Sequence, residues 1–506
     1  MKKIFILLTM VLTTVGAWAE VDFSKFVGCE VSFTNIQQDG TTKYTLYINN
    51  NNELALSTSS VEELGAAAKF FVEKRANNKY SFYNREKQLY MIWRGLNGGY
   101  NSDKGVLGTY NATYCDWTVK TGEELATTPT FYMVSKRNGG SKDGSLVVTK
   151  AGVFDGWGDS QALAANYSNL YNVKVETERI TYFRLKGNSG GYVDASSIYG
   201  NANATYGQMS IKSTENCNYA GTIFYYDNEN RFLNYATGTY VCVGREIAAV
   251  GAEASKNTAW DIYCTATKYQ FKLYGTYQDG ETKNVWLHDN SGNRADRCSV
   301  EGDHANTTHS WTLEKVEALP VTISAAKYAT FYAPVAVEVA EGVTAYTVTV
   351  NEEWATLNEI KSGVIPANTG VVLYSETAGT YDFAITEDVE AIEGNALLGS
   401  AATTYYTTAG TYYALAIVDG VVGFYKDAFN NSRFQNNSHK AYLYVPNVSS
   451  VKAFLFESGE TTAIETVETV ETENANAPIY DLSGRRVLNA VKGGIYIQNG
   501  KKFIVK

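Results

Sequence analysis

The feature that most constrains this chain is a threefold repeat near its N-terminus. Lys43–Tyr47 (KYTLY) recurs as Lys79–Tyr83 (KYSFY), with a looser copy at Thr130–Val134 (TFYMV). Because a unit that cannot bury its apolar face alone is completed by its neighbours, residues 29–176 are predicted to form one threefold domain. Each copy is followed by a second apolar strand and closes on an aromatic residue with valine two positions later: Glu53–Leu56 with Phe70/Val72, Gln88–Met91 with Trp117/Val119, and Ser145–Val148 with Tyr171/Val173.

A second threefold set follows the first. Alternation with period two, broken by Gly and Asn turns, is typical of β-strands. The 38 Tyr fit pleated surfaces, and the 43 Gly fit tight turns, beside only 6 Pro. The predicted opening strands are Tyr182–Leu185, Arg231–Leu233 and Tyr269–Leu273, the second strands are Gly191–Val193, Thr239–Val241 and Asn284–Leu287, and the closing aromatics are Phe224, Trp260 and Trp311.

Both sets resemble ricin-type β-trefoil modules arranged in tandem, over residues 29–315. Three closing tryptophans occupy the position of that family's Gln-x-Trp signature, and we assign them to the barrel core: Trp117, Trp260 and Trp311. The Gln is replaced each time, by Cys115, Thr258 and His309. The resemblance implies a trefoil fold and, with less support because of the missing Gln, sugar binding. Trp286 is likewise assigned to the interior of a strand.

The region after the trefoils changes character. Short apolar runs such as Ala329–Tyr332, Gly370–Tyr374 and Ala441–Val445, separated by Gly-rich turns, predict a β-sandwich-like domain. It is similar to accessory β-domains in surface proteins of Bacteroidota. Residues 458–478 are acidic, repetitive and without aromatics, so they are predicted to be a linker that builds no core.

The C-terminal segment becomes apolar again. Tyr480–Val487 and Gly494–Ile497 resemble the C-terminal sorting domain of the type IX secretion system. The resemblance implies that this segment is read by the secretion machinery. The alternative is a final hairpin that packs on the preceding domain.

The N-terminus predicts export. Lys2 and Lys3 precede an apolar run, and the small-residue site Ala17–Ala19 follows it, which is the pattern of a signal peptide cleaved after Ala19. No other stretch approaches roughly 18 apolar residues, so no transmembrane helix is predicted in the mature chain. Phe26–Cys29 is faintly similar to a lipobox, but charged residues separate it from the apolar run. We therefore predict an extracellular or outer-membrane-surface location in a Gram-negative bacterium.

The predicted architecture is all-β. It comprises a signal peptide (1–19), β-trefoil 1 (20–177), β-trefoil 2 (178–317), a β-sandwich-like domain (318–457), an acidic linker (458–478) and a sorting-like C-terminal segment (479–506).

The cysteines leave two interpretations open. All six lie in the mature chain, and an even number in an exported protein permits disulfides, most simply Cys29 with Cys115. Buried free thiols are the alternative, because these domains are large enough to fold without cross-links. The remaining candidates for disulfides are Cys217, Cys242, Cys264 and Cys298.

The sequence contains no motif for catalysis or for a cofactor. It has no His-Glu-x-x-His, no Gly-x-Ser-x-Gly and no phosphate-binding loop. His288, His304 and His309 lie close together, but the step between the last two matches no usual metal-ligand spacing, so we interpret them as solvated loop residues. A net charge of -10 with pI ≈ 5.2 argues against nucleic acid as a partner. We predict no catalytic residue, metal or cofactor.

Aromatic residues flanked by polar groups are the best candidates for a binding site. Trp157 lies between two glycines and is flanked by Asp155 and Asp159, so it is predicted at a loop tip, where its ring could stack on a sugar. Trp93 with Arg94 is the second candidate. The alternatives are that Trp157 anchors its loop against the barrel and that Trp93 simply continues an apolar strand.

Together these patterns predict a secreted or surface-attached, non-catalytic protein. Its trefoil loops would recognise carbohydrate in a lectin-like manner, with glycans or glycoproteins as partners. One alternative is a secreted hydrolase or its accessory subunit, which would need converging carboxylates in 320–457. The other is a trefoil-type protease inhibitor or protein-binding surface module.

The loop-tip hypothesis makes a testable prediction. Trp157→Ala should abolish glycan binding and leave the thermal unfolding midpoint nearly unchanged, because an exposed ring contributes contacts to the ligand rather than to the core. Binding on a glycan array and a thermal melt measure both effects. A large drop in the midpoint would show instead that Trp157 is a packing residue.

Overall fold

The computed structural model divides the chain into two compact units. The first contains Met1–Glu317 with Ala401–Thr403, and the second contains Ala318–Ser400 and Thr404–Lys506. The predicted signal peptide and acidic linker lie outside the described residues. The structure describes residues 23–95, 103–108, 112–125, 128–137, 142–157, 160–199, 207–227, 229–244, 247–251, 259–276, 282–290, 298–301, 307–351, 354–407, 410–426, 433–446, 450–456, 479–480, 486–487, 495–498 and 501–504.

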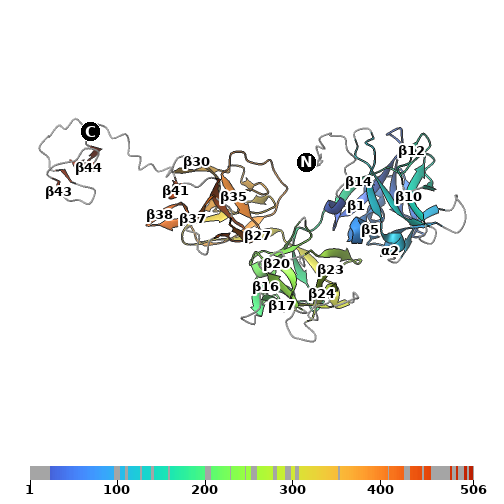
Figure 1. Cartoon of the computed structure of the whole chain (residues 1–506), viewed down its shortest axis with the longest axis horizontal. Helices are drawn as coiled ribbons and strands as arrows, with labels where there is room; N and C mark the ends of the chain where they lie inside the picture. Colours follow the sequence, from blue (N-terminus) through green and yellow to red (C-terminus); the bar gives the residue numbers. More distant parts are fainter. Residues whose placement is uncertain are drawn as a thin grey trace. The chain divides into compact units, whose positions relative to one another are not determined.

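The first trefoil consists of three four-stranded repeats, and Figure 1 shows their strands in blue to cyan. Short helical turns connect them: η1 (Phe23–Phe26), α1 (Val61–Leu64), η2 (Gly65–Ala68), η3 (Ala76–Asn78) and α2 (Ala112–Cys115). The strands are β1 (Glu30–Ile36), β2 (Lys43–Ile48), β3 (Leu54–Ser57), β4 (Phe70–Arg75), β5 (Lys79–Asn84), β6 (Leu89–Gly95), β7 (Asp103–Gly108), β8 (Thr118–Thr121), β9 (Phe131–Arg137), β10 (Lys142–Thr149), β11 (Phe154–Trp157) and β14 (Tyr171–Thr177), with a small extra hairpin, β12 (Leu163–Ala164) and β13 (Tyr167–Ser168).

The first and fourth strands of each repeat close a six-stranded barrel. β1 pairs with β4 and β14, β4 with β5, β8 with β9, and β9 with β14. A bridge between Tyr80 and Trp117 joins β5 to the end of the second repeat. The second and third strands form hairpins outside this barrel. Closure leaves no free barrel edge, which is how a small antiparallel sheet satisfies all of its backbone groups.

The second trefoil repeats this arrangement. β15 pairs with β18 and β26, and bridges at Arg231–Ala259 and Tyr269–Trp311 complete the second barrel. Its helical turns are η4 (Ala220–Thr222) and η5 (Thr307–His309). Its strands are β15 (Tyr182–Lys186), β16 (Tyr192–Tyr199), β17 (Gly207–Lys212), β18 (Ile223–Tyr226), β19 (Phe232–Asn234), β20 (Tyr240–Gly244), β21 (Ile247–Gly251), β22 (Asp261–Cys264), β23 (Tyr269–Thr276), β24 (Thr282–Asp289), β25 (Cys298–Glu301) and β26 (Thr312–Lys315).

The closing aromatic residues lie in the barrel cores, as the repeat pattern predicts. All six are fully buried: Phe70, Trp117, Tyr171, Phe224, Trp260 and Trp311. The polar ones each donate a hydrogen bond to a backbone carbonyl on the second strand of their own repeat. The distances are 3.0 Å for Trp117 Nε1 to Met91 O, 2.8 Å for Tyr171 OH to Leu146 O, 3.0 Å for Trp260 Nε1 to Val241 O and 3.1 Å for Trp311 Nε1 to Leu287 O.

The opening strand of the first repeat differs from our prediction. Lys43–Tyr47 lies in β2, the second strand, whereas the opening strand is β1. The opening strands of three repeats share a Phe-x-Asn motif, in which the Asn side chain donates two hydrogen bonds to carbonyls just before the closing strand of a repeat. This motif is the better repeat signal, and its members are Phe33/Asn35, Phe82/Asn84 and Phe232/Asn234.

The disulfide prediction is wrong for this structure. All six cysteines are free, and all except Cys217 are buried. The buried thiols pack in the apolar interior, where desolvation raises the pKa of Cys242 to about 12. Free cysteine behaves there as a small apolar residue, which matches the alternative interpretation.

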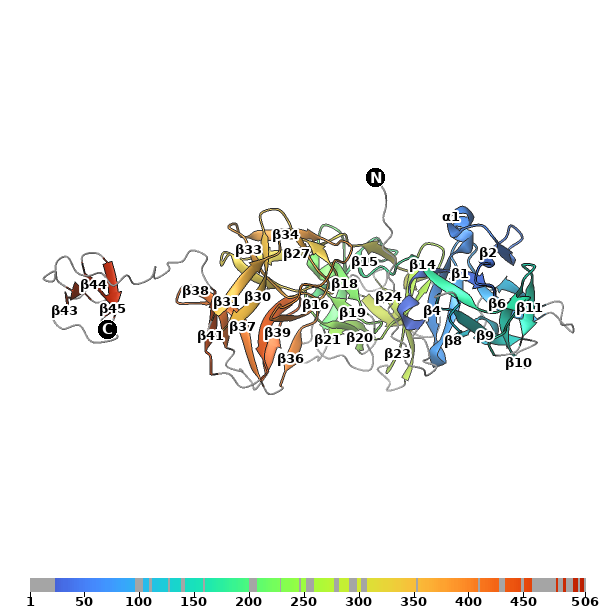
Figure 2. The same ribbon diagram turned by 90° about the horizontal axis from the view of Figure 1, so that it is seen from above.

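The second unit contains one nine-stranded sheet that encloses an apolar core (Figure 2). The end strands of this sheet are β28 (Tyr328–Phe331) and β35 (Leu397–Ser400). The sheet folds back on itself, because Tyr332 N at the end of β28 donates to His439 O before β40 (3.1 Å). The strands between these ends are β30 (Thr344–Asn351), β31 (Trp354–Glu359), β33 (Val371–Tyr374), β37 (Thr411–Val418), β38 (Val421–Lys426), β40 (Lys440–Val445) and β41 (Ala453–Phe456). Three separate pairs complete the unit: β27 (Ala318–Ile323) with β34 (Gly379–Ala384), β29 (Val337–Glu338) with β32 (Val364–Ile365), and β36 (Thr404–Tyr406) with β39 (Phe434–Asn436).

The C-terminal segment forms a small antiparallel sheet in the order β43-β42-β44-β45. These strands are β42 (Ile479–Tyr480), β43 (Arg486–Val487), β44 (Ile495–Gln498) and β45 (Lys501–Ile504). Within the described part of the chain, no helix has the length and apolar character needed to span a membrane.

The closing hydrogen bonds predict a measurable stability difference. Tyr171→Phe keeps the buried ring but leaves the Leu146 carbonyl without its donor, which should lower the free energy of unfolding by about 1–3 kcal/mol. Tyr219→Phe is the matched control, because Tyr219 is 46% exposed and its change should stay within about 0.5 kcal/mol. Equal unfolding curves for the two variants in denaturant would contradict this account.

Candidate functional site

A groove lies within the first unit, where the two trefoils meet. Its volume is about 750 Å³, which falls in the range of roughly 300–1,000 Å³ that is usual for small-molecule sites. The first trefoil contributes residues of β4, η3, β6 and the α2 region, and the second trefoil contributes β22, β23 and β24. Both trefoils are therefore needed to form it.

One face of three neighbouring strands forms the wall from the second trefoil. The register places Asp261 opposite Lys272 and Lys272 opposite Trp286, in one row across β22, β23 and β24. Tyr274 lies opposite Asn284 on the same face. Alternate residues point the other way into the barrel core, among them Ile262, Phe271, Leu273, Val285 and Leu287. The period-two alternation thus gives these strands one apolar side and one side that faces the groove.

The groove face is rich in aromatic rings. The rings of Tyr263 and Trp286 lie 5.4 Å apart, and Lys272 Nζ lies 5.3 and 5.7 Å from their centroids. Trp286 is partly exposed and Tyr274 is 65% exposed. An exposed Tyr beside a partly exposed Trp offers flat apolar surface that no side chain covers completely.

A buried acid joins the two trefoils beneath the groove. Glu73 of β4 is fully buried and accepts hydrogen bonds from the backbone N–H of Cys264 (3.3 Å), from Tyr90 OH (3.2 Å) and from Ser81 Oγ (3.1 Å). It also forms an ion pair with Arg75. Burial raises the pKa of Glu73, whereas Arg75 and these donors act to lower it. A buried carboxylate is stable only with such a full set of partners.

Arg75 extends the contacts of the buried Glu73 to the surface of the groove. Its guanidinium carbon lies 4.6 Å from the Tyr263 ring of the second trefoil and 5.5 Å from the Tyr90 ring of the first. Its Nε donates to Ser81 Oγ at 2.6 Å and lies 3.9 Å from Asp116 Oδ1. The Glu73–Arg75 pair therefore fixes both walls of the groove relative to each other.

Three polar side chains in the groove form no hydrogen bond or ion pair with the described residues, although Lys272 lies over the Tyr263 and Trp286 rings. Among the described residues, no hydrogen bond or ion pair engages the side chains of Asp261, Lys272 or Asn284. Burial raises the pKa of Asp261, against the lowering effect of Lys272, and burial lowers the pKa of Lys272. Both charged groups are thus partly desolvated, and their attraction to nearby opposite charges offsets only part of that cost, so hydrogen bonds from a ligand would add stability.

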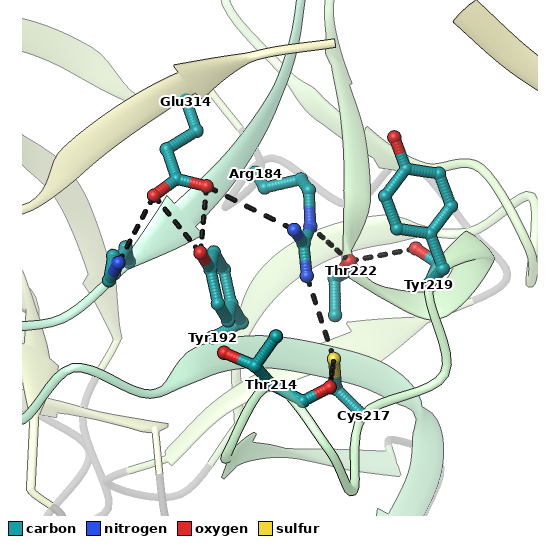
Figure 3. A network of polar contacts seen from close by, with 8 residues as sticks. Arg184, Tyr192, Thr214, Cys217, Tyr219, Thr222 and Glu314 are labelled. Atoms are coloured by element: carbon teal, nitrogen blue, oxygen red, sulfur yellow. Dashed lines mark hydrogen bonds and ion pairs between the residues drawn. The ribbon is translucent and has the colours of Figure 1, made fainter.

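A second polar cluster, drawn in Figure 3, has the opposite property. Glu314 accepts from Tyr192 OH (2.8 Å) and Lys186 Nζ (3.3 Å). Arg184 donates to Thr222 Oγ1 (2.8 Å) and Cys217 Sγ (3.5 Å), and its guanidinium carbon lies 3.8 Å from the Tyr192 ring centroid. These residues satisfy one another, so the cluster clamps β26 to β15 and β16 rather than offering a site.

The predicted binding residues are not among the described residues that line this groove. Asp155 and Trp157 lie in β11, where Gly156 pairs with Leu146, so the predicted loop tip is wrong for the backbone up to Trp157. Asp155 is partly exposed, whereas the Trp157 side chain and all of Asp159 lie outside the described residues. Trp93 and Arg94 lie in β6, paired with Gly105 and Lys104, and their side chains also lie outside that set.

The histidine interpretation is wrong for two of the three residues. His288 and His309 are buried, with ring centroids 5.0 Å apart, and His304 lies outside the described residues. Asp289 beside them accepts from Ser189 N (3.1 Å) and Oγ (2.9 Å). In the part of the chain that the structure describes, no group of three or more His, Cys, Asp or Glu could hold a metal ion.

Sequence reasoning missed the groove because it treated each trefoil separately. Trp286 was assigned to the interior of a strand, which is correct for its backbone, but its ring points to the groove side. A signal did exist. Asp261, Lys272 and Trp286 alternate with apolar residues along three segments that form neighbouring strands, two of which were predicted, so one face of this three-stranded sheet is polar and aromatic.

Comparisons with known proteins do not show a family for this chain. No protein-family model matches the chain, and no curated protein matches it. Among solved structures, the haemolytic lectin CEL-III overlaps with a TM-score of 0.22 and 11% identity, over 64% of this chain and 71% of its own. A mosquitocidal holotoxin overlaps with a TM-score of 0.22 and 11% sequence identity, over 95% of this chain but only 57% of the toxin. At such scores neither carries an argument, and the trefoils are identified by their strand pairing.

The partly desolvated carboxylate of Asp261 predicts that the groove lowers the stability of the fold. A raised pKa in the folded state means that the fold favours the protonated form, so ionised Asp261 costs stability above its ordinary pKa. Asp261→Asn should therefore raise the thermal midpoint at pH 7, and the gain should vanish as pH falls below the ordinary carboxyl range. Asp382→Asn, an exposed change in the second unit, is the control. A variant that melts lower at pH 7 would contradict the assignment.

Proposed function

We propose that this protein is a non-catalytic carbohydrate-binding protein that recognises glycans in the groove between its two trefoils. The observation that carries the proposal is the combination of accessible aromatic rings with polar groups that form no hydrogen bond or ion pair with the described residues. Trp286 and Tyr274 can stack on the apolar C–H face of a sugar, while Asp261, Lys272 and Asn284 can bind its hydroxyls. The proposal keeps the lectin-like function predicted from sequence, but it places the binding site in the groove rather than at Trp157 or Trp93.

The groove favours binding over hydrolysis. A glycosidase of the usual kind needs two carboxyl groups that work as a pair across the scissile bond. Asp261 is one carboxylate in the groove, and Asp116 is the other. Because Arg75 lies beside Asp116, that carboxylate is held at the groove wall rather than left available. A hydrolase therefore remains an alternative that no observed carboxylate pair supports.

Export and surface display complete the proposal. The signal peptide predicted at 1–19 would deliver the chain across the inner membrane. The sheet β42–β45 supplies a small folded element at the C-terminus, as a segment read by a type IX-like secretion machinery would need. A groove that binds glycans on such an exported protein would attach the cell, or the secreted protein, to a carbohydrate surface.

Removing the Trp286 ring tests the proposed site. Trp286→Ala should reduce glycan binding at least about tenfold, if stacking of a sugar on this ring contributes on the order of the 1–3 kcal/mol that base stacking on aromatic side chains does. The change should affect thermal unfolding little, because Trp286 is only partly buried and faces the groove. Binding of the full mature chain to a glycan array and isothermal titration with the best ligand provide the measurement.

The matched control is Trp354→Ala, which removes an exposed tryptophan of the second unit (48% exposed) and should leave binding unchanged. Trp157→Ala separates the groove from the site predicted by sequence. Loss of binding in Trp157→Ala with full binding in Trp286→Ala would overturn the proposed location and restore the loop hypothesis.

A further inference from the structure

Charges in the groove are balanced, and this bears on which glycans fit. Among the described residues, three cations and two carboxylates line the groove, and a third acid is buried beneath it: Lys74, Arg75 and Lys272 against Asp116, Asp261 and Glu73. The described residues of the site therefore carry no net charge with which to compensate a charged ligand. A groove built for acidic glycans would show an excess of Lys and Arg instead.

The unpaired charges are also placed as a matched donor and acceptor. Asp261 and Lys272 are direct neighbours across β22 and β23, yet no ion pair joins them. The carboxylate can accept hydrogen bonds, and the ammonium can donate them. Two hydroxyls on adjacent carbons of a sugar can satisfy both groups at once, one donating to Asp261 and the other accepting from Lys272.

Trp286 extends the same row by one strand. Because neighbouring strands lie about 4.8 Å apart, the row from Asp261 through Lys272 to Trp286 spans about 10 Å. A sugar ring that stacks on Trp286 therefore turns its edge of hydroxyls toward Lys272 and Asp261. The first trefoil closes the opposite side with Asn77 and Asn78, which adopt left-handed backbone angles (φ 59° and 53°).

We propose that the groove selects neutral glycans by bridging a vicinal diol between Asp261 and Lys272, and that it rejects the same sugars when they carry an acidic or an amino group. This inference rests on the proposed function. When the diol engages both Asp261 and Lys272, an added sulfate or carboxylate would face the like charge of Asp261, and an added amine would face the like charge of Lys272. The partial desolvation of both groups makes such an unbalanced charge more costly than it would be in open solvent.

The test uses the full mature chain and an array of paired glycans. Lactose, mannose and N-acetylglucosamine oligosaccharides are presented in neutral and sulfated form, and the N-acetylglucosamine series also in deacetylated, amino form. We expect each bound neutral glycan to lose at least about tenfold in affinity on sulfation or deacetylation, because one charge is then left unpaired.

Two groove variants should shift this preference in opposite directions. Asp261→Asn removes a negative charge and should improve the sulfated form relative to the neutral one. Lys272→Gln removes a positive charge and should improve the amino form. The exposed changes Asp382→Asn and Lys361→Gln in the second unit alter net charge by the same amounts and should leave the preference unchanged.

The possible outcomes separate the two proposals. If charged forms bind as tightly as their neutral partners or more tightly, selection of neutral glycans is overturned, while glycan binding in the groove stands. If no glycan in any form binds, the proposed function fails and the inference fails with it. If binding is neutral-selective but both groove variants keep the wild-type preference, the Asp261–Lys272 bridge is overturned.

Discussion

The hydrogen-bonded aromatic residue that closes each repeat is the interaction on which the rest of this fold depends. A Trp or Tyr fills the barrel core, and its polar atom binds a carbonyl of the second strand, as for Trp117 with Met91 and Trp311 with Leu287. One side chain thereby fixes the hairpin of a repeat onto the barrel. Because buried indole and phenol donors need a partner, this contact also selects one packing arrangement among many apolar ones. Phe70 and Phe224 occupy the equivalent place in the first repeats with packing alone.

The second constraint joins the barrels to each other. Glu73 is buried and accepts a hydrogen bond from the backbone N–H of Cys264 in the other trefoil, so separating the trefoils would remove one of its donors. The barrels have their apolar residues in one continuous cluster, which includes Phe33 and Phe271. A rigid junction of this kind can hold two walls of a groove at a constant distance. Such a junction also explains how Asp261, Lys272 and Asn284 on the wall from the second trefoil can be held in place for a ligand.

Local patterns in the sequence predicted the fold well and the site poorly. Period-two alternation and the spacing of Trp117, Trp260 and Trp311 identified two trefoils, because burial of a repeated face leaves a mark on the sequence. The opening strand β1 was missed because the match between KYTLY and KYSFY is long and easy to see. The Phe-x-Asn motif that marks the true opening strands has only two fixed residues. The groove could not be derived in the same way, because it depends on which faces of the two barrels meet. Trp157 attracted attention through its flanking glycines, yet Gly156 is simply a strand residue opposite Leu146.

The central claim is that the junction between the trefoils is the glycan site. A crystal structure of the mature chain, soaked with the neutral oligosaccharide that binds best on the array, tests it most directly. The account predicts density for a sugar ring over Trp286, with adjacent hydroxyls near Asp261 and Lys272. A sugar bound at the β10–β11 hairpin of the first trefoil, with the groove empty, would contradict the account.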